Sequence, residues 1–167
     1  MRRSKGFTGK RIISVDNGTD LGVVKDVYFD RDLTKIAGLF LGNEGLLSRQ
    51  ALLVPSSAIT LFGQDAILVN HCQVVTNSTP TDITEWVRRD RLQGRAITSA
   101  GGTKVGTIND VLVDGAGIVK AFSLAMIFLN SPITQTRLIR RNVVLDIGSA
   151  GSPMTIDLAK AEHQSLL

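Results

Sequence analysis

Carboxylates that recur at equivalent positions of an internal repeat are the residues of this chain best suited to chemistry. Asp26 and Asp110 form one such pair, and Asp30 and Asp114 form another. Paired carboxylates can transfer protons or hold a hard cation. Each pair is split between two repeats, however, and no histidine or metal-binding motif lies beside it. We therefore expect these carboxylates to be structural, accepting backbone N–H bonds at strand ends or turns.

The remaining reactive residue types also fail to form a site. His71 and His163 have no cysteine or carboxylate at metal-ligand spacing. Cys72 is the only cysteine, which excludes an internal disulfide and fits a reducing compartment. A reactive Cys72 would need a base, but the adjacent His71 would point to the opposite face of a strand. Phosphate-loop and nucleophile-elbow motifs are missing. The sequence thus predicts no enzyme activity, no cofactor and no metal.

Charge and exposed leucines indicate binding surfaces instead. The formal net charge is +4, with 19 basic and 15 acidic residues, and the basic residues fall in clusters. Solubilising surface charge is the simplest interpretation, and an anionic partner, either RNA or a membrane surface, is the alternative. Adjacent leucines in a polar loop could dock on a partner or close the mouth of a barrel. The candidate partner-binding residues are Leu46, Leu47, Arg88, Arg89, Arg137, Arg140 and Arg141.

The most informative feature is the repeat itself. Gly18–Asp30 and Gly102–Asp114 share six of thirteen residues, and four further positions exchange one bulky apolar residue for another. Chance would give about one identity, so duplication is the economical explanation. Similarity continues on both sides, and each copy spans about 75 residues.

Within each copy the pattern is that of β-strands. Apolar residues alternate along Leu21–Phe29, and Lys25 and Asn109 interrupt the pattern at equivalent points, which indicates a bulge, an edge or an exposed segment. Gly18 and Gly102 stand where a hairpin turn requires a positive φ. We predict an all-β fold with two tandem small β-barrels of about six strands each. The expected divisions are 1–78 for the first barrel, 79–91 for a connector and 92–167 for the second.

Two short helices are expected outside the barrels. Asp82 followed by Glu85 is typical of a capping box and predicts a helix over Ile83–Arg89 in the connector. Trp86 lies on this segment, and we expect it to pack the connector against a barrel. A C-terminal helix is expected within Ile156–Gln164, with Leu158 and Ala161 facing inward.

The repeated motif resembles the PRC-barrel family, which is named for the H subunit of the photosynthetic reaction centre. A Gly-Lys or Gly-Arg opening is followed by an apolar strand, a glycine turn and a Val/Ile-x-Asp-Val-x-Val/Phe-Asp strand. The resemblance covers Lys10–Val69 and Gly94–Asp157. Pro55 precedes the penultimate strand of the first copy, as in the family, whereas Arg140 takes its place in the second. The resemblance implies a small barrel of about six strands that docks onto other macromolecules.

We therefore expect a non-enzymatic adaptor that docks onto or helps to assemble a protein complex, and the resemblance favours a photosynthetic or membrane-associated one. The alternative is an RNA-binding or ribosome-maturation factor, and a homo-oligomer is also left open. The basic N-terminus is not followed by an apolar stretch, and the longest apolar run, Ile118–Leu129, is too short to span a bilayer as a helix. A cytoplasmic protein, or one peripheral to a membrane, is expected.

Overall fold

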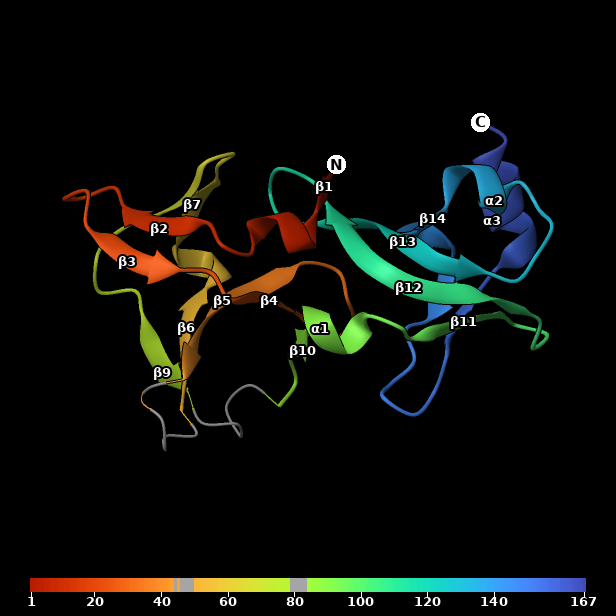
Figure 1. Ribbon diagram of the computed structural model, residues 1–167, viewed down its shortest axis with the longest axis horizontal. Helices are drawn as coiled ribbons and strands as arrows, with labels where there is room; N and C mark the ends of the chain where they lie inside the picture. The colour runs from red at the N-terminus through yellow and green to blue at the C-terminus, as the bar shows by residue number, and fades with distance from the viewer. Residues whose placement is uncertain (44, 46–49, 79–83) are drawn as a thin grey trace.

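The computed structural model describes residues 1–43, 45, 50–78 and 84–167 and consists mainly of β-strands with a few short helices. Two lobes lie side by side along the long axis, and short segments of both chain halves meet between them (Figure 1). The predicted all-β class is confirmed. In neither lobe does the described hydrogen bonding close the strands into one continuous barrel.

The first lobe contains two sheets. One has the strand order β3 (Asp20–Val23), β2 (Arg11–Ser14), β8 (Ala66–Val69) and β7 (Ile59–Phe62). The other has the order β10 (Val87–Arg88), β4 (Asp26–Phe29), β5 (Ile36–Asn43), β6 (Ala51–Pro55) and β9 (Thr76–Ser78). A 3-10 helix, η2 (Ser56–Ala58), leads from β6 into β7. Strands β2 and β8 pair in parallel, and the other pairs of this lobe are antiparallel.

The second lobe repeats this plan in a single sheet. Its strand order is β14 (Leu138–Arg140), β13 (Val119–Ile127), β12 (Lys104–Val113), β11 (Ala96–Ser99), β16 (Met154–Ile156) and β15 (Val144–Asp146), with β1 (Arg2–Arg3) also paired to β12. Helices α2 (Ile133–Thr136), η3 (Arg141–Val143) and α3 (Leu158–Ser165) complete it. The parallel pair β11–β16 corresponds to β2–β8.

The shared interruption of the apolar pattern falls where the two lobes differ in sheet structure. Lys25 lies between β3 and β4, which end up in different sheets, whereas Asn109 lies at a shift of register inside the continuous strand β12. The glycine turns behave as expected, since φ is +69° at Gly18 and +87° at Gly102.

A reciprocal exchange joins the lobes. Strand β1, at the start of the chain, pairs with β12 of the second lobe, and β10, which precedes the second repeat, pairs with β4 of the first lobe. Each strand leads into a short helix, η1 (Ser4–Phe7) or α1 (Arg89–Leu92), and both helices lie between the lobes (Figure 1). Each lobe therefore contributes its leading segment to the other.

Reciprocal backbone bonds connect the lobes a second time, at the turns that follow β4 and β12. The N–H of Ile36 donates to the carbonyl of Gly117 at 2.8 Å, and the N–H of Val119 donates to that of Thr34, also at 2.8 Å. One cluster of buried apolar residues runs through both lobes, and Phe7 and Leu92 are buried within it. The two repeats thus share a single core.

The two helix predictions have different outcomes. The predicted helix over Ile83–Arg89 is wrong, because Val87 and Arg88 form β10 and the helix begins only at Arg89. Pairing with β4 overrides the local helix signal there, and Asp82, the predicted cap, lies outside the described residues. The C-terminal helix is confirmed as α3, whose N-cap Asp157 accepts a bond from the Lys160 N–H at 3.0 Å.

Candidate functional site: a groove at the junction of the lobes

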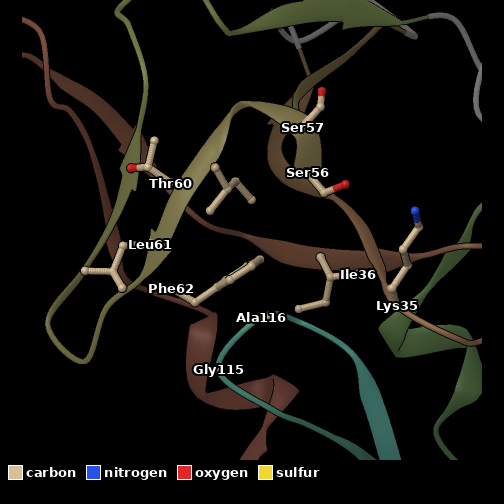
Figure 2. Close-up of a pocket in the computed structure, with 10 residues that line it drawn as sticks. Lys35, Ile36, Ser56, Ser57, Thr60, Leu61, Phe62, Gly115 and Ala116 are labelled. Carbon is tan, nitrogen blue, oxygen red and sulfur yellow. The ribbon is translucent and has the colours of Figure 1, made fainter.

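A groove of about 400 Å³ opens where the first lobe meets the second. Figure 2 shows its lining: helix η2 and strand β7 on one side, and the start of β5 with the turn before β13 on the other. The lining residues are Lys35, Ile36, Ser56, Ser57, Ile59, Thr60, Leu61, Phe62, Gly115 and Ala116. The groove therefore depends on both repeats.

The floor of the groove is apolar and firmly packed. Ile36 and Phe62 lie at its base and are both buried (Figure 2). The Phe62 ring contacts the Phe7 ring, with centroids 5.4 Å apart, and lies against Gly117 of the other lobe. A Cβ atom at Gly117 would stand only 3.0 Å from the Phe62 ring, and φ is +82° there, so glycine is required at this close approach. The floor is thus fixed from both lobes.

One wall of the groove is a sheet edge. Four consecutive residues of β7 line it, and β7 is the terminal strand of its sheet in the described part of the chain. The turn after β7 is held by two cations, because the Arg2 guanidinium donates to the Phe62 and Gly63 carbonyls and the Lys10 ammonium donates to Gly63 at 3.0 Å. A fixed strand edge can accept a further strand through main-chain hydrogen bonds.

The rim of the groove is polar and carries positive charge. Ser56 and Ser57 stand on η2 above the floor (Figure 2), and Lys35 is the only charged residue among those that line the groove. Asp30 accepts bonds from the backbone N–H groups of Thr34 and Lys35, at 2.6 and 3.1 Å. These bonds position the turn that carries Lys35, whose side chain is exposed and lines the groove.

The repeat predicts a second groove beside η3, at the position equivalent to the groove beside η2, but a side chain fills that space. Arg141 begins η3 as Ser56 begins η2, and its guanidinium donates to the Leu33 carbonyl at 3.0 Å and to the Asp32 carbonyl at 2.8 Å. These carbonyls belong to the turn that corresponds to Gly115–Gly117. A long side chain therefore bridges the lobes on one side, whereas the short Ser56 leaves the corresponding space open on the other.

The repeated carboxylates accept backbone N–H bonds, as predicted. Asp26 and Asp110 are buried, and each accepts a bond from the next backbone N–H, at 2.9 and 2.8 Å. Each is also capped by the exchanged segment of the opposite repeat: the Arg89 guanidinium donates to Asp26 at 2.9 Å, and the Ser4 hydroxyl donates to Asp110 at 2.6 Å. Asp26 and Asp110 thus join the lobes, and neither is among the residues that line the groove.

The predicted basic residues of the connector take part in internal contacts. Arg88 binds Asp90 through two hydrogen bonds and lies over the Phe40 ring at 5.2 Å. The hydrogen bond from Arg88 lowers the pKa of Asp90, and burial raises the pKa of Tyr28 beside it. The Arg89 guanidinium is paired with the Asp26 carboxylate. Both arginines therefore hold β10 and α1 in place, and their role toward a partner stays a prediction.

The predicted arginines of the second repeat differ in whether their guanidinium groups are free to bind a partner. Arg137 donates to the Ala125 carbonyl at 2.7 Å, and Arg141 bridges the lobes as described. Arg140 is exposed and has no ion pair within the described ranges. The predicted Leu46 and Leu47 lie outside the residues that the structure describes. The prediction that these residues bind a partner is thus still open.

Trp86 packs the connector onto the first lobe, as expected. Its ring stands over Gly38, where an added Cβ atom would lie 2.9 Å away, and its centroid lies 5.8 Å from that of Tyr28.

Cys72 is a free, half-buried thiol, and His71 accepts a bond from the Gln73 N–H at 3.2 Å. In residues 1–43, 45, 50–78 and 84–167 no group of three metal-ligating side chains comes together.

The groove itself was not predicted. It arises from the contact between two turns more than 80 residues apart. One signal in the sequence pointed toward it: the second turn, Asp114–Gly117, contains two glycines where the first, Asp30–Leu33, has bulkier residues. That difference leaves space beside Phe62 on one side of the junction only.

Comparison with known proteins supports the family resemblance. Residues 2–71 match the family model of the PRC-barrel domain. The match covers the first repeat, and the second repeat is related to it by the shared residues and the shared topology. A search of curated proteins found no match to the chain. Across the described part of the chain, no helix is both long and apolar enough to cross a membrane.

Proposed function

Because residues 2–71 match the family model of the PRC-barrel domain, we propose that the protein is a non-enzymatic adaptor that binds an extended segment of a partner protein in the junction groove. The observation that carries this proposal is the coincidence of a terminal strand, an apolar floor and a positive rim in one groove. The segment would lie alongside β7 and add a strand to its sheet.

The molecule already uses strand addition to hold its own parts together. Strands β1 and β10 each contribute only two residues, yet each pairs with the opposite lobe and leads into a short helix that buries one large apolar side chain, Phe7 or Leu92. Main-chain bonds supply affinity in this mode, and alternate side chains supply specificity. In the groove, Ile36 and Phe62 would receive the apolar side chains of the segment.

The charge of the groove indicates which residues the bound partner segment would carry on the face opposite its apolar side chains. Lys35 is the charged residue among the described lining residues, with Asp30 on its backbone N–H, and Arg2 and Lys10 hold the turn next to the groove. The formal net charge of +4 favours association with an acidic partner. We therefore propose a segment in which apolar and acidic residues alternate, as part of a protein complex into which this chain docks.

The alternative of an RNA-binding maturation factor receives less support. It depends on Arg137, Arg140 and Arg141, and two of these three guanidinium groups already donate to main-chain carbonyls. Tight RNA binding with a steep salt dependence would favour it. A photosynthetic or membrane-associated complex remains the most specific candidate that the family resemblance suggests for the partner.

The proposal can be tested by selecting peptides from a random display library on the full chain. We expect enrichment of sequences that alternate apolar and acidic residues. Leu61, which is half-exposed at the groove, offers the test variant Leu61→Asp, and Leu145, similarly exposed on the edge strand β15, offers the matched control Leu145→Asp.

Loss of apolar contact and repulsion of the acidic peptide should weaken binding to Leu61→Asp about tenfold or more. Binding to Leu145→Asp should equal that of the unmodified chain. Peptides without such alternation, or peptides that bind both variants equally, would contradict the groove as the docking site.

A further inference from the structure

A second cavity lies on the second repeat, beside the turn between β12 and β13, and has a different chemistry. It has a volume of about 580 Å³ and is lined by Met1, Asp114, Val119, Lys120, Arg140, Arg141 and Asn142. Three of these seven residues are basic and one is acidic. We propose that this cavity binds a phosphate group, and that it does so independently of the junction groove.

The internal repeat shows that the basic residues are an addition to the common framework. Arg140 pairs with Ala121 as Pro55 pairs with Gly38, so Arg140 and Pro55 are equivalent. The next residues differ in the same sense, with Arg141 and Asn142 on η3 where Ser56 and Ser57 stand on η2.

Lys120 is a third basic residue whose counterpart in the first repeat is not basic. It follows Val119 as Ala37 follows Ile36, and Ala37 is buried. The framework therefore folds without any of these cations, as the first lobe demonstrates. Arg141 also bridges the lobes, so the cations that the framework leaves without a structural account are Lys120 and Arg140, and binding of an anion would account for both.

The three cations are suited to an anion in different ways. The Arg141 guanidinium is fixed by its bonds to the Leu33 and Asp32 carbonyls, so binding costs it little further ordering. Arg140 is exposed and has no ion pair within the described ranges, which leaves its donors for a ligand. Lys120 is held beside Asp114, with nitrogen and oxygen 3.4 Å apart. One cation is thus preorganised, one is free and one is tethered.

The charge of the cavity matches a phosphate monoester. Three positive charges, from Lys120, Arg140 and Arg141, and one negative charge, from Asp114, give a net charge of +2. Asp114 counts as ionised at neutral pH because the backbone N–H of Ile118 lowers its pKa. A phosphate monoester carries about −1.5 to −2 at this pH and has three acceptor oxygens. Met1 and Val119 also line the cavity, and their apolar side chains would contact the organic part of such an ester.

The experiment uses the full chain and the double variant Lys120→Gln/Arg140→Gln. Lys104→Gln/Lys160→Gln removes the same charge from exposed positions on β12 and α3, and it serves as the control. One arm measures binding of glycerol 3-phosphate, a soluble phosphate monoester, by calorimetry. The other measures sedimentation with vesicles of phosphatidic acid and phosphatidylcholine against vesicles of phosphatidylcholine alone. The two arms distinguish a soluble phosphate ester from a lipid headgroup.

We expect the unmodified chain to bind in at least one arm and the site variant to bind about tenfold or more weakly, since charge-assisted hydrogen bonds are lost. The control variant should bind within about twofold of the unmodified chain, because its charges lie outside the cavity and are screened. An equal loss in both variants would reduce the effect to overall charge and overturn the proposal. Absence of binding in both arms would overturn it as well.

Discussion

Arg89→Ala tests whether the exchanged segments hold the lobes together. The Arg89 guanidinium donates to the Asp26 carboxylate at 2.9 Å, and the two side chains are 12% and 9% exposed. Without Arg89 the buried carboxylate loses its nearest cation, and breaking a buried ion pair typically costs about 3–5 kcal/mol.

Two features of the structure reduce that figure. Asp26 keeps its bond from the Val27 N–H, and Arg88 remains 3.7 Å away. The Nη1 atom of Arg89 is buried without a partner in the described part of the chain, so the native pair does not fully offset its own desolvation. We therefore expect Arg89→Ala to lower the free energy of unfolding by about 2–3 kcal/mol.

The assay is urea denaturation, followed by the fluorescence of Trp86, the only tryptophan, and by circular dichroism. Arg91→Ala, at an exposed position on the same helix, is the matched control and should change stability by less than about 0.5 kcal/mol. The two probes should report one transition, since the lobes share a core. Equal stability of the Arg89→Ala and Arg91→Ala variants would refute this account of the exchange.

Two further predictions concern the outer face of the first lobe. Gly38→Ala should displace Trp86, because the new Cβ would lie 2.9 Å from its ring and 3.0 Å from the Val54 carbonyl; a red shift of Trp86 fluorescence would show this, and Gly115→Ala, with open space around it, should cause none. Tyr28, the only tyrosine, should ionise above pH 10.0 in an absorbance titration, because burial raises its pKa. Since the neutral form is favoured in the fold, this contribution to stability is complete below the unfolded pKa and is lost as the pH rises beyond it. Arg88→Gln should raise the midpoint further, and an unchanged midpoint would contradict the contact.

The repeat made much of the fold predictable. Gly18 and Gly102 were expected to take positive φ, and they do. The buried acids Asp26 and Asp110 were expected to accept backbone N–H bonds, and they do. These features depend on residues close in sequence, and their appearance in both copies made them clear.

The way in which the two lobes pack together could not be predicted from the sequence. Val87 and Arg88 form a strand only because β4 of the first lobe offers them an edge, and the local pattern favoured a helix. The junction groove likewise depends on two turns that meet in space, with Gly117 admitting the Phe62 ring. Such contacts between distant segments leave no periodic signal in the chain.

The most direct test of the proposed docking mode is to methylate backbone nitrogens of a selected peptide, one at a time. In a strand added to β7, alternate N–H groups of the peptide face the sheet, so methylation should weaken binding strongly at every second position and little at those between. Fluorescence anisotropy against the full chain measures this pattern. Equal effects at all positions, or none at any, would contradict strand addition in the groove.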